Sequence, residues 1–282
     1  MTVLPPEVFC AIAEIARAEA GLHLAPTKTA MVDARVRRRL RLLGLSSYRD
    51  YGDLLAGTSP GAERERRILV NAMTTNVTAL FRERHHFDAI AAHVAGRMRS
   101  RRGEVIRIWS AGGSDGSEAV SAVLAVAEAC PGLDAARLQV LVTDVDDGAV
   151  QAATAGAYPI AALSAQDWSR YGAFLARRED GSFTLADALR RCIEVRRHNL
   201  AGAASVGHAF DAVLCRNVLI YFDDDVKRQV QERLVSAVRP GGILCLGHSE
   251  RLIAAAPGAE QMARLGTTCF RRDLPGRRVA CQ

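Results

Sequence analysis

A loop of small residues lies between a predicted strand and a predicted helix, where it could bring backbone groups close to a ligand. The loop runs from Ser110 to Glu118 (SAGGSDGSE), after the apolar segment 105–109. In open α/β folds, ligands bind at the carboxyl ends of the strands. The loop lacks both G-x-G-x-x-G and the phosphate-loop pattern, so it does not indicate a dinucleotide or nucleoside triphosphate. Taken alone, it is equally consistent with a flexible turn.

A carboxylate further along the chain narrows the choice of ligand. The segment RLQVLVTD ends at Asp144, and a carboxylate there can accept hydrogen bonds from both hydroxyls of a ribose. Its alternative role is to cap the helix that begins near Asp146 and Asp147, although one of those neighbours can cap it instead. An adenosine-containing ligand without a phosphate cradle points to S-adenosylmethionine. The turn at 240–242 (PGG) before a late strand fits a methyltransferase sheet, whose last two strands form a hairpin.

The elements that would position these groups alternate between strand and helix from residue 105 onward. This alternation predicts right-handed crossovers and a parallel, doubly wound α/β sheet. The segment 267–273 is predicted to be an edge strand that returns antiparallel to 240–248. Asp180-Gly181 predicts a small β hairpin inserted at about 174–192. The strands are expected at 105–110, 137–144, 210–215 and 240–248, and the helices at 117–130, 146–156 and 224–238.

The first seventy or so residues predict a small all-helical domain. Val8, Ile12 and Ile15 share one helical face, and residues 31–43 interleave apolar side chains with arginines. Gly44 is a natural end for that helix, and Ser46 or Ser47 can cap the next one. A charged helix is expected at 63–73.

Composition predicts an ordinary globular protein and excludes several classes. The 282 residues are 49% apolar, and 37 Lys+Arg against 31 Asp+Glu give a net charge of +6, which is too mild to indicate nucleic acid. No apolar run approaches a membrane span, so we expect a cytoplasmic protein without membrane insertion. The cysteines form no C-x-x-C pair, so neither disulfides nor a metal site is predicted. They are Cys10, Cys130, Cys192, Cys215, Cys245, Cys269 and Cys281.

Several motifs, taken in order, resemble those of the chemotaxis receptor methyltransferases (CheR). Residues 75–82 (TNVTALFR), followed by His86-Phe87, are similar to the family's N-x-T-x-F-F-R…F signature. The resemblance covers nearly the whole chain. It implies a helical domain at 1–74, a linker and helix at 75–100, and a class I methyltransferase domain at 101–282. The other matching segments are IWSAGGSDGSEAVS, LVTDVD, CRNVLIYFD and PGGILCLGHSERL.

The resemblance implies a cofactor site for S-adenosylmethionine that draws on several segments. Helix capping is the alternative role for Asn76 and Thr78, and a loop turn is the alternative for Asn199. The implied cofactor residues are Asn76, Thr78, Arg82, Glu118, Asp144, Asn199, Leu200, Arg216 and Asn217.

The implied reaction is methyl transfer to glutamate carboxylates on the cytoplasmic helices of methyl-accepting chemoreceptors. The carboxylate is already ionised at neutral pH, so catalysis rests on positioning and on removal of water. Arg82 and Tyr221 are expected to orient the acceptor carboxylate, although Tyr221 could instead be an aromatic core residue. We expect a monomer.

A basic helix is the expected docking surface for the acidic receptor. Its arginines would attract the receptor helices electrostatically, although most charge runs are only solvated faces. They are Arg35, Arg37, Arg38, Arg39 and Arg41.

The chain departs from the family pattern at a few positions. Residues 114–121 (SDGSEAVS) stand where S-T-G-E-E-P-Y-S is common, and Leu80 replaces a Phe. The predicted hairpin lacks the glycine pair of members that tether to a receptor tail. Two other functions therefore stay open: an inactive, cofactor-binding docking module of a signalling complex, and a small-molecule methyltransferase.

Overall fold

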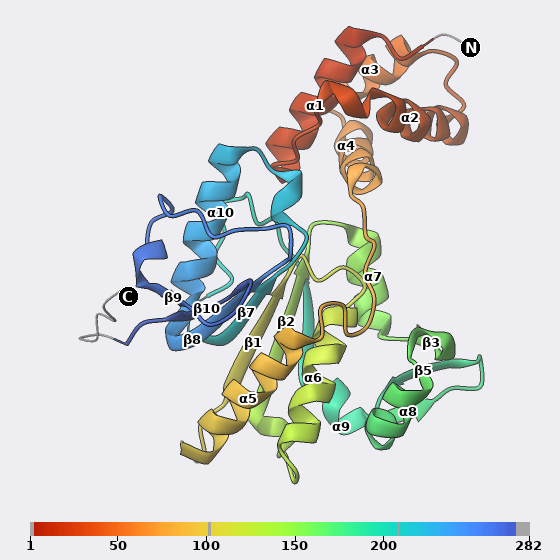
Figure 1. Ribbon diagram of the computed structural model, residues 1–282. Coiled ribbons are helices and arrows are strands. Elements are labelled where there is room, and N and C mark those ends of the chain that lie inside the picture. The colour runs from red at the N-terminus through yellow and green to blue at the C-terminus, as the bar shows by residue number, and fades with distance from the viewer. Residues whose placement is uncertain (1–2, 101–102, 208, 275–282) are drawn as a thin grey trace.

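The chain forms a helical amino-terminal module above an α/β domain, with a small second sheet at one side (Figure 1). The computed structural model describes residues 3–100, 103–207 and 209–274. Cys281 lies outside these ranges, and the other six cysteines are free thiols. No helix within the described ranges is long and apolar enough to span a membrane.

The amino-terminal module contains four helices, as the sequence predicts. Gly44 ends the second helix in the left-handed conformation (φ 68°), which glycine adopts without a steric penalty. The Ser47 side chain caps the third helix by accepting from the Asp50 N–H at 3.1 Å. The helices are α1 (Pro6–Ala20), α2 (Thr29–Leu43), α3 (Tyr48–Ala56) and α4 (Pro60–Met73).

The main sheet has seven strands in the order β6-β2-β1-β7-β8-β10-β9, and all pairings are parallel except those of β10. The strand order reverses beside β1, so the loops after β1 and β7 diverge and leave a crevice for a ligand. The strands are β1 (Ile106–Ala111), β2 (Leu138–Asp144), β6 (Ile193–Arg197), β7 (Phe210–Cys215), β8 (Val238–Leu246), β9 (Met262–Arg264) and β10 (Cys269–Arg272).

The structure confirms the antiparallel hairpin and corrects the position of its last strand. Segment 267–273 was expected at the sheet edge, but β10 lies between β8 and β9, so that prediction is wrong. The edge strand β9 has only three residues, too few to display an alternating pattern. Strand β6 at the other edge was not predicted, because its side chains are all at least partly exposed and it carries three charges in five residues.

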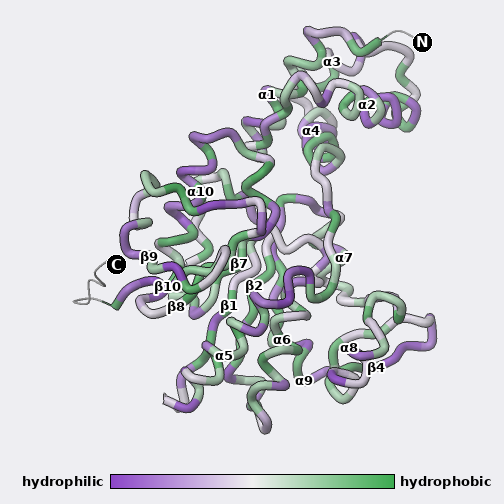
Figure 2. The backbone as a smooth tube through the Cα atoms, viewed as in Figure 1, coloured by the Kyte–Doolittle hydropathy of each residue, from purple (hydrophilic) through white to green (hydrophobic). Residues whose placement is uncertain are grey.

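Helices cover both faces of the main sheet and create two cores. Side chains of α5, α6 and α7 pack against one face, and those of α10 pack against the other. The apolar strands β1, β2 and β7 run green or pale through the centre of Figure 2, whereas α2 is strongly hydrophilic. The helices are α5 (His85–Ser100), α6 (Ser117–Ala129), α7 (Asp147–Ala155) and α10 (Asp224–Ala237).

The inserted hairpin forms where the sequence predicts it, with Gly181 in the left-handed conformation (φ 78°). A third strand, β3, joins it from an earlier part of the chain. The elements of this small layer are β3 (Tyr158–Pro159), α8 (Ala165–Tyr171), β4 (Leu175–Arg177), β5 (Ser182–Leu185) and α9 (Asp187–Arg190). The 3-10 turns of the chain are η1 (Pro26–Lys28), η2 (Ala135–Arg137), η3 (Ile160–Ala162), η4 (Gly172–Phe174), η5 (Leu219–Tyr221) and η6 (Ala259–Gln261).

The helical module and the α/β domain share one continuous apolar core. Leu22, just after α1, forms a β-bridge with Phe222, and the N–H of His23 donates to the Tyr221 carbonyl at 2.8 Å. These contacts fix the end of α1 beside η5. The segment 74–84 returns from the module to the domain without regular helix, so Asn76 and Thr78 do not cap a helix there.

Candidate active site

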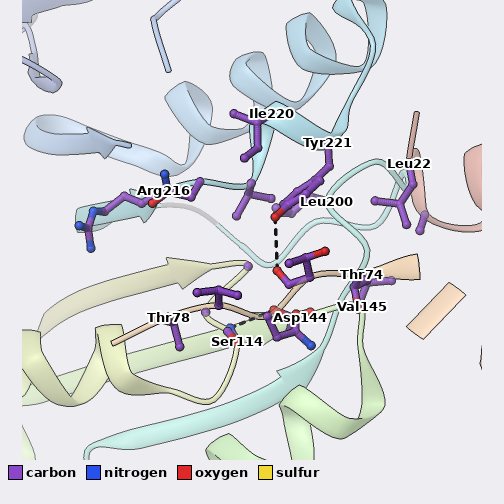
Figure 3. Close-up of a pocket in the computed structure, with 18 of the residues that line it drawn as sticks. Leu22, Thr74, Thr78, Ser114, Asp144, Val145, Leu200, Arg216, Ile220 and Tyr221 are labelled. Carbon is purple, nitrogen blue, oxygen red and sulfur yellow. Dashed lines mark hydrogen bonds between the residues drawn. The ribbon is translucent and has the colours of Figure 1, made fainter. Parts of the chain in front are cut away.

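One pocket lies at the carboxyl ends of β1, β2 and β7, under the end of α1 and the segment 74–82 (Figure 3). All the predicted cofactor and catalytic residues line it, although they come from five separate parts of the chain. They are Asn76, Thr78, Arg82, Glu118, Asp144, Asn199, Leu200, Arg216, Asn217 and Tyr221.

Asp144 stands at the base of this pocket with both carboxylate oxygens already anchored. Oδ2 accepts from the Ser114 N–H at 2.9 Å, and Oδ1 accepts from the Asp146 N–H at 3.0 Å. Burial raises the pKa of Asp144, and these two N–H groups act in the opposite direction. A carboxylate offers about four acceptor positions, so capacity remains for two ligand hydroxyls.

The glycines of the loop after β1 are required mainly by packing against the protein. Gly112 has φ 71°, and a Cβ there would lie 2.5 Å from Cγ2 of Val218. A Cβ on Gly113 would lie 2.7 Å from both Ser110 Oγ and Val142 Cγ1. The small residues thus let this loop close against β2 and against the turn after β7.

A buried ion pair joins two pocket residues behind the wall. Arg216 Nη1 donates to Glu118 Oε2 at 3.0 Å, and Ser110 Oγ donates to Glu118 Oε1 at 2.7 Å. Arg216 Nη2 donates to the carbonyl of Arg82. Figure 3 shows the Arg216 side chain running away from the pocket centre. Burial raises the pKa of Glu118, and the charge of Arg216 opposes this.

Asp146 holds the segment between the helical module and the α/β domain against the end of the sheet. Its Oδ2 accepts from Thr74 Oγ1 at 2.6 Å and from Asn76 Nδ2 at 2.7 Å. Its Oδ1 caps α7 by accepting from the Gly148 N–H at 2.7 Å. The sequence indicated the cap but missed the contact with 74–76. The sequence signal that could have indicated this contact is a second carboxylate, Asp146, two residues after Asp144.

Asn199 and Leu200 line the pocket from the loop that follows β6. The Asn199 side chain accepts from the Ala201 N–H at 2.9 Å and donates to the Glu19 carbonyl at 2.8 Å. Asn199 therefore makes the loop turn that was its alternative role, and it also ties that loop to α1. The buried Leu200 side chain supplies an apolar surface, while its carbonyl accepts from Arg233 at 2.6 Å.

Arg82 and Tyr221 line the mouth of the pocket, and Arg35 lies beside it, in contact with Thr75. The Tyr221 hydroxyl donates to the Thr75 carbonyl at 3.4 Å, and Arg82 Nη1 donates to the Val77 carbonyl at 3.0 Å. Arg35 of α2 donates to Thr75 Oγ1 at 3.4 Å. Burial lowers the pKa of Arg35, and its Nη1 is buried without a partner within the described ranges.

The hydrogen-bonding of two buried oxygen atoms shows whether the pocket suits S-adenosylmethionine. Ser114 Oγ and Asn217 Oδ1 line the pocket, are buried, and have no hydrogen-bond partner among residues 3–100, 103–207 and 209–274. Buried polar atoms are nearly always hydrogen-bonded. The ammonium, ribose hydroxyls and adenine amine of the cofactor are all donors, so the residues present fit it.

The arginines of α2 do not form one surface. Arg39 donates to Glu65 Oε1 at 2.8 Å and Oε2 at 2.7 Å, with only 15% of its side chain exposed. Arg37 pairs with Asp33 at 2.8 Å. Arg35 faces the pocket mouth, whereas Arg38 and Arg41 are exposed. A helix that packs on α4 must direct some positions inward, so the five arginines do not share one exposed face, and receptor docking by them stays a prediction.

One group of possible metal ligands exists within the described ranges, at Glu83, His85 and His86, whose ligand atoms lie within 4.8 Å of one another. Arg216 Nη2 lies 3.7 Å from Glu83 Oε2. The ligands also surround the amino terminus of α5, where the helix dipole favours anions. Both features oppose a cation there.

The fold and the pocket together define an S-adenosylmethionine-dependent methyltransferase with a seven-stranded sheet and a helical amino-terminal module. Residues 7–74 match the family described as CheR methyltransferase, all-alpha domain, and residues 76–268 match CheR methyltransferase, SAM binding domain. The chain belongs to the CheR family of chemotaxis protein methyltransferases.

Similar proteins carry the same description along most of their length. A probable chemotaxis protein methyltransferase of Rhizobium etli is 35% identical over 92% of this chain and 97% of its own. Chemotaxis protein methyltransferase 2 of Pseudomonas aeruginosa is 37% identical over 84% and 83%. The chemotaxis protein methyltransferase of Escherichia coli is 35% identical over 86% and 83%.

Proposed function

We propose that this methyltransferase forms methyl esters on glutamate side chains in the cytoplasmic helices of chemoreceptors. The single observation that carries the proposal is the mouth of the pocket, which Arg82 and Tyr221 line and where Arg35 of α2 contacts Thr75, the residue that the Tyr221 hydroxyl also contacts. Two guanidinium groups and a hydroxyl suit a carboxylate acceptor.

The residues of this chain act mainly by positioning. The cofactor, when bound, supplies a methyl group on a sulfonium that leaves as a neutral thioether. Asp144 would hold the ribose, and Ser114 and Asn217 would accept hydrogen bonds from its other donors. Arg82 and Tyr221 would place the acceptor oxygen in line with the methyl group. The acceptor carboxylate would lose its water shell on entering the site. The acceptor is already ionised, so no side chain has to remove a proton.

Receptor docking would use the helical module, residues 1–74, whose exposed arginines Arg38 and Arg41 extend the positive charge of Arg35 away from the pocket. An acidic helix lying along this face would present its glutamate at the mouth. The linker and helix at 75–100 would complete the cofactor site for the domain at 101–282. The enzyme would act as a monomer in the cytoplasm, where these receptor helices lie.

The test is a methylation assay on receptor-containing membranes with radiolabelled cofactor. We expect base to release the transferred methyl groups, as it does from esters. No methylation should occur when the acceptor glutamates of the receptor are replaced by Gln or when the enzyme carries Asp144→Ala. Cofactor binding by calorimetry without any base-labile methylation of the cell's receptors would contradict the proposal and favour a docking module. Methylation of a small molecule instead would also overturn it.

A further inference from the structure

The segment Gly247-His248-Ser249-Glu250 matches the family but has no role in the cofactor or acceptor contacts described so far. In the structure it lies behind the pocket wall. The Glu250 side chain is buried, with 4% of the residue exposed. Its carboxylate faces the turn that follows β7, which includes Asn217 and the 3-10 turn η5.

The Glu250 carboxylate accepts four backbone hydrogen bonds. Oε1 accepts from the N–H groups of Val218 at 2.8 Å and Leu219 at 2.7 Å. Oε2 accepts from the N–H groups of Asn217 at 3.0 Å and Gly247 at 2.7 Å. Three successive N–H groups pointing at one centre form an anion-binding concavity, and here the anion is a side chain of the same protein.

This arrangement holds a backbone conformation that is otherwise unfavourable. Asn217 has φ 59°, in the left-handed region that few residues other than Gly, Asn and Asp adopt. Gly247 approaches so closely that a Cβ would lie 2.8 Å from the Asn217 nitrogen and 2.9 Å from Glu250 Oε2. Gly247 and Glu250 therefore fit the turn as one unit.

The same turn carries a large share of the pocket wall. Asn217, Val218, Ile220 and Tyr221 all line the pocket. Tyr221 reaches the mouth, and Asn217 Oδ1, which has no hydrogen-bond partner among the residues that the structure describes, lies in the wall. Any movement of the turn thus displaces both the cofactor contacts and the acceptor contacts.

We propose that Glu250 is a positioning residue, whose carboxylate sets the turn 217–221 in the conformation that binds S-adenosylmethionine and places Tyr221. In Glu250→Gln an amide NH₂ would face two of the four N–H groups, so two hydrogen bonds are lost and donors oppose donors. Glu250→Asp keeps the charge on a side chain one methylene shorter.

The test compares cofactor affinity with stability. We expect Glu250→Gln to raise the Kd for S-adenosylmethionine at least tenfold by calorimetry and to lower kcat at saturating cofactor, at a temperature well below the Tm of the variant. Glu250→Asp should lie between this variant and the natural protein. Calorimetry needs no acceptor, so this test can fail or succeed independently of the proposed receptor substrate.

A matched control separates positioning from stability alone. Asp211 is equally buried at the opposite end of β7, where it accepts from the Arg107 N–H at 2.9 Å and from Arg239 at 3.1 Å. Asp211→Asn should lower the Tm but leave the cofactor Kd within twofold. If Glu250→Gln also kept its Kd and kcat within twofold, the proposal would be overturned. If Glu250→Gln fails to fold, unchanged constants in Glu250→Asp overturn it in the same way.

Discussion

Arg216 Nη1 lies 3.0 Å from Glu118 Oε2, and only 3% and 10% of the two side chains are exposed. This contact links the turn after β7 to the first turn of α6. Through Arg216 Nη2 it also reaches the carbonyl of Arg82. The motifs implied Glu118 and Arg216 as cofactor contacts. These two residues therefore also connect separate segments that line the pocket.

Removing one partner of this pair should destabilise the protein strongly. Arg216→Met leaves the Glu118 carboxylate buried without its cation, which costs about 3 to 5 kcal/mol of unfolding free energy. Arg216→Met with Glu118→Gln should recover part of the loss, because the buried charge is gone. Urea unfolding measures both, and an Arg216→Met variant as stable as the natural protein would contradict the assignment.

Asp144 should control cofactor affinity. Asp144→Ala removes the acceptor expected for two ribose hydroxyls, each bond to a charged group being worth about 1.5 to 3 kcal/mol, so the Kd for S-adenosylmethionine should rise roughly 100 to 10,000-fold. Calorimetry gives the Kd directly. Asp134→Ala, which removes an exposed capping carboxylate before the same strand, should leave it unchanged, and equal effects of the two substitutions would count against the ribose contact.

Tyr221 should affect turnover more than cofactor binding. Tyr221→Phe removes the hydroxyl at the mouth but keeps the ring, so we expect kcat to fall about tenfold, equivalent to about 1.4 kcal/mol, with little change in cofactor Kd. Tyr171→Phe, in the buried core of the inserted layer, is the matched control. Unchanged turnover in both Tyr221→Phe and Arg82→Ala at saturating cofactor would exclude the proposed acceptor contacts.

The arginines of α2 should separate into two kinds. Arg38→Glu should raise the KM for receptor several-fold at low salt and much less at about 0.5 M salt, because screening weakens contacts between exposed charges. Arg39→Gln should instead lower stability by about 3 kcal/mol, because the buried Glu65 carboxylate loses its cation and keeps only the hydroxyl of Tyr51. Steady-state kinetics at two salt concentrations and urea unfolding distinguish these outcomes. A salt-independent effect of Arg38→Glu would contradict electrostatic docking.

His86 should make the protein sensitive to acid. Burial lowers the pKa of His86 to about 4 from an ordinary value of 6.5, so the folded state keeps it neutral while the unfolded chain takes up a proton. Stability should therefore fall as the pH falls from about 6.5 to about 4, by up to about 3 kcal/mol from this residue.

Urea unfolding at pH 7.5 and pH 4.5 measures this dependence. His86→Gln can keep a hydrogen bond to Thr268, which His86 Nε2 contacts at 2.8 Å, but it cannot titrate. The variant should show a smaller loss on acidification than the natural protein, and an equal loss in both would assign the effect to other groups.

The sequence by itself determined the fold class and the composition of the pocket. Strand and helix periods predicted most elements of the α/β domain, because an apolar strand and an amphipathic helix have distinct local patterns. The position of Asp144 after a strand, and motifs around residues 76, 118, 200 and 217, identified residues that do line one pocket. These signals are local in the sequence, so they can be recognised without knowing how the chain packs.

Only the tertiary structure decided how those residues divide their tasks. The guanidinium of Arg216 could have pointed to the ligand, but packing directs it to Glu118 and Arg82. The roles of Asp146 and Glu250 depend on partners that are distant in sequence, such as Asn76 and Val218. A hydrogen bond between distant segments leaves no periodic mark on either one, so its partners become known only when the chain is folded.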